Sequence, residues 1–221
     1  MSVTTTTSET MKKGILCGML AIVLTSALPL YAQTVMAPDQ LARSVTDEVL
    51  AILRADRDIN ASHPDKLMNL IETKVLPHFN FMRMTQLAVG KNWRRANAQQ
   101  RDALAGQFRT LLVRTYTAAF TSYRDQKIIY RPLRMQPDDQ DVVVKSQVIQ
   151  PGGPPVAVDY SMEKTRNGWK VYDVAIEGVS LVQNYRSSFN SEIQRAGIDG
   201  LIQALDGKNR QLAQRTQGAS Q

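Results

Sequence analysis

The spacing of apolar residues changes twice along the chain, from helical to alternating near Ile128 and back to helical after Gly178. Alternation is the pattern of a strand with one buried face. The turn residues of Pro151–Pro154 fit neither a helix nor a central strand, and Asn167–Gly168 is a hairpin signal. The predicted strands are 128–131, 141–150, 155–164 and 168–176. They predict a four-stranded antiparallel meander sheet.

Helical patterns lie on both sides of these strands in the sequence. Apolar residues three and four apart predict amphipathic helices at 39–56, 64–75 and 98–122. Asn80 is a candidate cap for a further short helix that ends at Gly90. After Gly178 two apolar stripes follow, Leu181, Val182, Tyr185, Phe189 and Ile193, then Ile198, Leu201, Ile202 and Leu205. Several helices packed against one antiparallel sheet define an α+β fold.

The N-terminal segment has the order of a secretory signal. Lys12 and Lys13 precede an apolar run that ends before Pro29. The run is shorter than the roughly 20 residues that a membrane-spanning helix needs. We therefore expect residues 1–32 to be a signal peptide that is removed, 33–206 to form a single domain, and 207–221 to be a flexible tail. Cys17, the single cysteine, lies in the signal, so the mature chain has no disulfide.

Few residues suggest catalysis or a metal site. His63 and His78 lack the spacing of a zinc motif, and no phosphate-binding loop or nucleophile elbow occurs. We therefore predict no catalytic residues and no metal. The formal charge of +7 is compatible with an anionic partner, but the basic residues are spread along the chain. We expect no nucleic acid as a partner.

The apolar residues of the strands have two interpretations. A sheet covered by apolar helix stripes encloses either a filled core or the wall of a pocket. The residues alone leave both open. A pocket could also belong to a small-molecule enzyme, for which Asp159 or Asp173 would supply the acid.

Three segments resemble one protein family. The run from Gly168 to Phe189, G-W-K-V-Y-D-V-A-I-E-G-V-S-L-V-Q-N-Y-R-S-S-F, resembles the C-terminal motif of the periplasmic phospholipid-binding proteins of the Mla (maintenance of lipid asymmetry) system. These are the MlaC, or toluene-tolerance, proteins. The run N-F-x-x-M from Asn80, followed by G-x-x-W from Gly90, is similar to their helical half. The run G-I-D-G-L from Gly197 is similar to their end, so the resemblance covers roughly residues 39–205.

The resemblance implies a monomeric periplasmic carrier without enzymatic activity or cofactor. Its fold would be an NTF2-like cone whose interior apolar pocket holds the acyl chains of a glycerophospholipid, the cargo. It would carry lipid between an outer-membrane lipoprotein–porin complex and an inner-membrane ABC transporter with an MCE-domain subunit. This transport would maintain the lipid asymmetry of the outer membrane.

The apolar residues of the predicted strands and helices are the candidates for the pocket wall. They are Phe108, Leu112, Tyr116, Val144, Val158, Tyr160, Tyr172, Val174, Ile176, Leu181 and Tyr185. Arg114 and Arg186 are candidates for meeting the lipid phosphate. Two alternatives stay open: an enzyme on an NTF2-like scaffold of the steroid-isomerase type, and an interaction module whose interior is a filled core.

Overall fold

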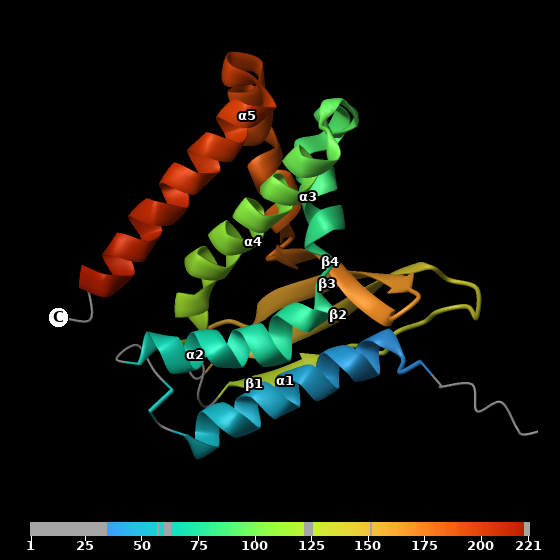
Figure 1. The fold of residues 1–221 in the computed structure, drawn as a ribbon. Helices are drawn as coiled ribbons and strands as arrows, with labels where there is room; N and C mark the ends of the chain where they lie inside the picture. Colours follow the sequence, from blue (N-terminus) through green and yellow to red (C-terminus); the bar gives the residue numbers. More distant parts are fainter. Residues whose placement is uncertain (1–34, 57, 60–62, 122–125, 151, 219–221) are drawn as a thin grey trace, which may run out of the picture. The chain divides into compact units, whose positions relative to one another are not determined.

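The alternating segment forms one antiparallel sheet with its strands in sequence order (Figure 1). The computed structural model describes residues 35–56, 58–59, 63–121, 126–150 and 152–218, so the predicted signal peptide lies outside the described residues. The strands are β1 (Lys127–Tyr130), β2 (Asp141–Ile149), β3 (Val156–Thr165), β4 (Gly168–Ile176) and β5 (Val179–Ser180). The predicted meander is confirmed, but the sheet has five strands and not four.

The fifth strand follows a two-residue turn. Glu177 and Gly178 have φ angles of 50° and 78°. Two positive φ angles in succession are typical of the tight hairpin turn whose twist matches that of the strands. The turn brings Ser180 opposite Ala175. The Glu177 amide donates to the carbonyl of Ala157 at 2.9 Å, which holds this unusual non-glycine conformation. The prediction missed β5 because two residues are too few to alternate.

Helices occupy the segments that the apolar spacing predicts. Before the sheet come α1 (Pro38–Ala55), α2 (Pro64–Leu70), the π-helical η1 (Ile71–Val75), the 3-10 helix η2 (Leu76–His78), α3 (Phe81–Val89), the 3-10 helix η3 (Gly90–Arg95) and α4 (Ala98–Thr121). Asn80 caps α3, accepting a bond from the Arg83 amide at 3.1 Å. Asn97 and Gln100 form a reciprocal capping box at the start of α4, with bonds of 2.8 and 3.1 Å. In the part of the chain described, no helix is long and apolar enough to cross a membrane.

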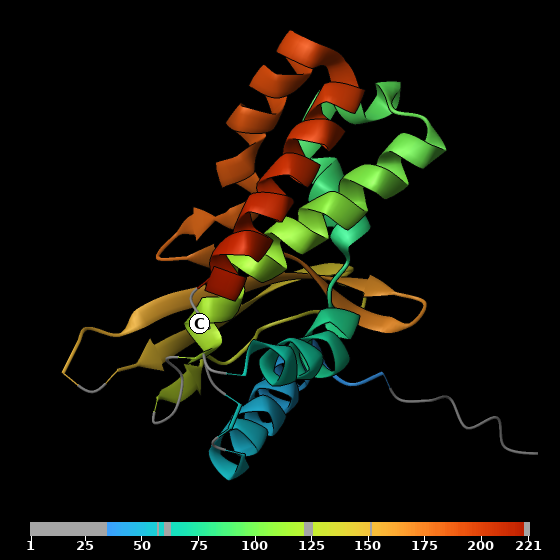
Figure 2. The same cartoon turned by 60° about the vertical axis from the view of Figure 1, so that its left-hand side comes forward.

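The last helix, α5 (Leu181–Gly218), consists of two legs. Gly197 breaks it with a φ of 75°, and each predicted apolar stripe occupies one leg. Figure 2 shows the second leg returning beside α4. This leg extends past residue 207, where the sequence predicts a flexible tail. Asn209 is only 3% exposed and donates to the Gln107 carbonyl at 2.9 Å. Polar contacts continue the packing there, which the apolar pattern does not reveal.

Two glycines of α5 should respond in opposite ways to alanine. Gly197→Ala should lower the free energy of unfolding by about 1 kcal/mol, because an L residue is strained at positive φ. Gly207→Ala should raise it by about 0.5–1 kcal/mol, because Gly207 is helical and open space surrounds its Cβ position. Urea denaturation of both variants checks this pair. Stabilisation by Gly197→Ala would contradict the break at that residue.

Three apolar clusters make up the interior. One joins α3, α4 and α5 around Phe108. A second lies on the sheet around Val144 and Met162, and a third joins α1 to α2 and η1 around Leu67. In Figures 1 and 2, α3, α4 and α5 group together beyond the sheet, while α1 and α2 lie side by side. The three clusters are separate because a cavity lies where they meet.

Candidate functional site

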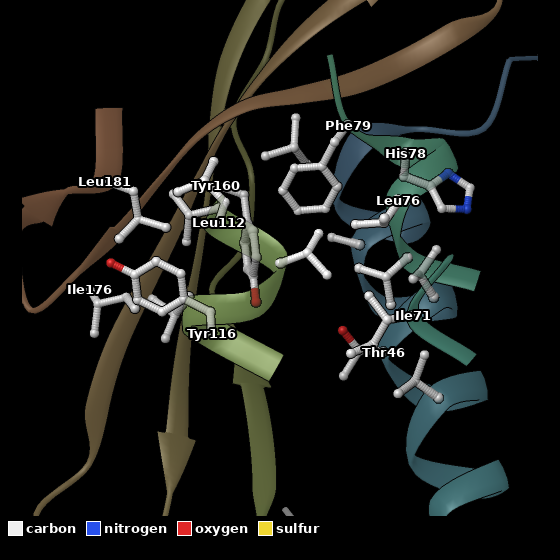
Figure 3. Close-up of a pocket in the computed structure, with 18 of the residues that line it drawn as sticks. Thr46, Ile71, Leu76, His78, Phe79, Leu112, Tyr116, Tyr160, Ile176 and Leu181 are labelled. Atoms are coloured by element: carbon white, nitrogen blue, oxygen red, sulfur yellow. The ribbon is translucent and has the colours of Figure 1, made fainter. Parts of the chain in front are cut away.

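A cavity of about 320 Å³ is lined by members of all three apolar clusters. Its volume falls within the range of about 300–1,000 Å³ that is usual for small-molecule sites. Figure 3 shows two groups of side chains facing one another across it. Leu112, Tyr116, Tyr160, Ile176 and Leu181 lie on one side, and Thr46, Ile71, Leu76 and Phe79 lie on the other.

The helix α1 supplies much of one wall. Its lining residues recur at helical spacing, and η1 continues this wall with Ile71 and Val75. The α1 residues are Leu41, Ala42, Val45, Thr46, Val49, Leu50 and Leu53. A buried tyrosine of β1 fixes the helix, since the hydroxyls of Tyr130 and Thr46 lie 2.6 Å apart and Tyr130 donates to the Ala42 carbonyl at 3.1 Å.

The opposite wall combines the sheet with the second half of α4. Alternate residues of neighbouring strands face the cavity, and the register places Val158 opposite Ile176 and Tyr160 opposite Val174. The helix contributes Leu112, Val113, Tyr116 and Thr117, and α5 contributes Leu181 at its first residue. Residues about 70 positions apart in the sequence thus form one surface.

The cavity offers few polar groups to a ligand. Among the described residues that line it, none is Asp, Glu, Lys or Arg. Burial, followed by the charge of Lys170, lowers the pKa of His78, which favours the neutral imidazole. Burial also raises the pKa of Tyr116, and the hydroxyl of Tyr185 adds to this. The cavity therefore suits a hydrocarbon ligand held by shape and burial.

A sequence model of the family described as MlaC protein matches residues 43–207 of the chain.

The chain belongs to the MlaC protein family.

Its relatives include proteins named for lipid transport and for solvent tolerance. The intermembrane phospholipid transport system binding protein MlaC of Haemophilus influenzae is 26% identical over 169 residues, 75% of this chain and 79% of that protein. The toluene tolerance protein ttg2D of Pseudomonas putida is 25% identical over 199 residues, 90% of this chain and 92% of that protein. The predicted resemblance is confirmed.

A solved structure shares the fold. The phospholipid-binding protein from Ralstonia solanacearum, in complex with a phospholipid, matches with a TM-score of 0.75 at 40% identity. The match covers 80% of this chain and 99% of that chain. The α+β class predicted for this MlaC protein is therefore confirmed.

Part of the predicted pocket wall lies at the cavity of this MlaC protein. The predicted residues that line it are Leu112, Tyr116, Val158, Tyr160, Val174, Ile176 and Leu181. They come from α4, β3, β4 and the start of α5, the segments that the alternating and helical patterns single out. Their contact with lipid stays a prediction.

The other predicted wall residues lie elsewhere. Phe108 is fully buried and packs edge-to-face on Tyr185, with ring centroids 5.1 Å apart. Val144 is fully buried in the sheet cluster. The ring of Tyr172 lies under the Arg83 guanidinium, 3.7 Å from its centroid. None of these residues lines the cavity, because neighbouring side chains cover each of them.

The polar candidates also have other positions. Arg114 donates to the backbone carbonyl of Asn209, and Arg186 lies beside Gly90, so neither lines the cavity. Asp173 accepts bonds from the Ser180 hydroxyl at 2.5 Å and the Val182 amide at 3.1 Å, at the start of α5.

Asp159 lies 4.0 Å from Lys145 in a cross-strand pair, outside the cavity lining. Within the described residues, no group of His, Cys, Asp or Glu is arranged to hold a metal ion.

The prediction missed the wall formed by α1, η1 and η2. Its residues include Val45, Val49 and Leu76. The stripe of α1 was visible in the sequence, but an apolar stripe has the same spacing whether it packs against a core or faces a cavity. The π-helical turn at Ile71–Val75, a feature frequent at functional sites, left no separate sequence signal.

Proposed function

We propose that this MlaC protein is a periplasmic phospholipid carrier that holds the acyl chains of a glycerophospholipid in the cavity described above. The observation that carries the proposal is the lining, which contains no Asp, Glu, Lys or Arg among the described residues. A phospholipid-bound structure of a protein 40% identical to this chain supports the same ligand class.

Acyl chains need such a cavity to cross an aqueous space. Two chains with about 30 methylenes, at roughly 0.8 kcal/mol each, represent about 24 kcal/mol of apolar burial that exposure to water would remove. The carrier therefore has to replace the bilayer. Because the tails exchange one hydrocarbon environment for another, transfer from membrane to protein is close to balanced. Direction then comes from the partners at each membrane.

The proposed partners are an outer-membrane lipoprotein–porin complex and an inner-membrane ABC transporter with an MCE-domain subunit. The name of the Haemophilus influenzae relative, an intermembrane phospholipid transport system binding protein, supports a role in such a system. Carrying lipid between these complexes would maintain outer-membrane asymmetry. The toluene tolerance of the Pseudomonas putida relative fits this role, since an asymmetric membrane resists solvent.

Native mass spectrometry of the protein purified from periplasm tests the proposal. We expect an adduct of one phospholipid mass, and solvent extraction should release a lipid of the same mass. The protein without lipid, mixed with phospholipid vesicles, should regain the adduct. A protein that is purified empty and takes up no lipid from vesicles would overturn the carrier function.

A further inference from the structure

A second, polar chamber shares part of its wall with the apolar cavity. It also has a volume of about 320 Å³, and Leu50 and Ile128 line both spaces. We name it the polar chamber and define it by Asp47, Leu50, Arg54, Gln126, Lys127 and Ile128. An amphipathic ligand could therefore occupy both spaces with its apolar and polar parts.

Secondary structure places the charged groups of the polar chamber at this boundary. On α1, Asp47, Leu50 and Arg54 are three and four residues apart, so they lie on one face of the helix in successive turns. On β1, Lys127 and Ile128 are consecutive, so their side chains point to opposite faces of the strand. One residue step on each element thus separates apolar wall from charge.

The charges of the polar chamber are of both signs. Arg54 and Lys127 are cationic, and Asp47 is anionic. In the part of the chain that the structure describes, Asp47 and Lys127 form no ion pair with each other or with another residue. Unpaired charges of opposite sign around one chamber match a ligand that carries both a phosphate and an amine.

The geometry points to the polar chamber as the headgroup site of the carried lipid, with selectivity for zwitterionic, amine-bearing glycerophospholipids. This rests on the proposed carrier function. With the acyl chains in the apolar cavity, the phosphate lies nearest the boundary, beside Lys127 and Arg54. The amine lies beside Asp47. An anionic lipid with a glycerol headgroup offers the phosphate but no cation for Asp47.

A lipid competition tests this selectivity. The protein without lipid is equilibrated with excess vesicles of equimolar phosphatidylethanolamine and phosphatidylglycerol, then separated, and its bound lipids are quantified by mass spectrometry. We expect the ratio of bound phosphatidylethanolamine to phosphatidylglycerol to exceed one. In Asp47→Asn the ratio should fall about two- to fivefold, the range for one partly exposed ion pair.

A second variant tests the phosphate contact. Lys127→Gln should weaken retention of both lipids by a similar factor, because both carry a phosphate, and should leave their ratio unchanged. Asp138→Asn and Lys91→Gln are the matched controls, since they change the net charge equally at exposed residues outside the polar chamber. Both controls should behave like the wild type.

The outcomes separate this inference from the carrier function. Wild-type protein that takes up no lipid overturns the carrier function, and this inference with it. Lipid uptake with the same ratio in wild type and Asp47→Asn overturns the headgroup site alone. O-phosphoethanolamine is the third arm: if it binds while vesicle lipid does not, the polar chamber serves a free soluble ligand, which also overturns the assignment.

Discussion

Leu112→Glu should give a folded protein that carries no lipid. Leu112 is 6% exposed and lines the cavity from α4. Water can solvate the new carboxylate while the cavity is empty, but an acyl chain would displace that water. Desolvating an unpaired charge costs several kcal/mol, so lipid occupancy should fall at least about tenfold. Native mass spectrometry measures the occupancy, and circular dichroism checks the fold.

Two controls isolate the position and the charge. Leu112→Met keeps an apolar side chain of similar volume and should retain lipid. Gln99→Glu adds the same charge at an exposed residue of α4 and should also retain it. Val174→Glu, on β4, repeats the test from the opposite element of the wall. Full occupancy in either folded glutamate variant would exclude the cavity as the acyl-chain site.

The sequence predicted the sheet because alternation repeats over enough residues to be recognised. β2, β3 and β4 each have nine or ten residues, and strong turn signals separate them. β5 has two residues and depends on the local geometry of Glu177 and Gly178, which leaves no periodic pattern. The second leg of α5 was predicted too short for a similar reason. Its last turns pack through Asn209, a polar residue that sequence patterns assign to the surface.

The cavity wall was harder to predict than the fold. Leu112 and Phe108 lie on the same helix, one turn apart, and both are buried. Phe108 meets the rings of Tyr185 and Phe189, whereas Leu112 borders open space. Spacing predicts that a residue points inward, but whether other atoms fill the space in front of it depends on elements far away in the sequence. Here the space depends on how α1 sits against the sheet through Tyr130.

The same distinction explains why the phosphate candidates of the sequence were misplaced. Arg114 was chosen for its place on the apolar-lined helix, yet it reaches the backbone of α5. The cations beside the cavity, Arg54 and Lys127, belong to α1 and β1. Their common position depends on the packing of two elements more than 70 residues apart, which one-dimensional spacing does not encode.

Phe108→Ala should have the opposite effect to Leu112→Glu, because it should lose stability and keep lipid. Phe108 is fully buried, and its ring packs edge-to-face on Tyr185 and Phe189, with centroids 5.1 Å away from each. Truncating such a ring leaves an internal void and typically lowers the free energy of unfolding by about 3–5 kcal/mol. Urea denaturation of the protein without lipid measures this loss. Lipid occupancy of the folded fraction should equal that of the wild type.

Phe79→Ala is the matched comparison, since Phe79 is a partly buried ring that lines the cavity. One side of Phe79 borders open space, so fewer atoms lose a partner when the ring is removed. Its loss of stability in the protein without lipid should be smaller than that of Phe108→Ala. Its extra stability on adding lipid should also be smaller than that of the wild type, because the bound chain loses a contact. If Phe108→Ala abolished lipid binding in folded protein while Phe79→Ala left it intact, the acyl chains would lie in the helical cluster and not in this cavity.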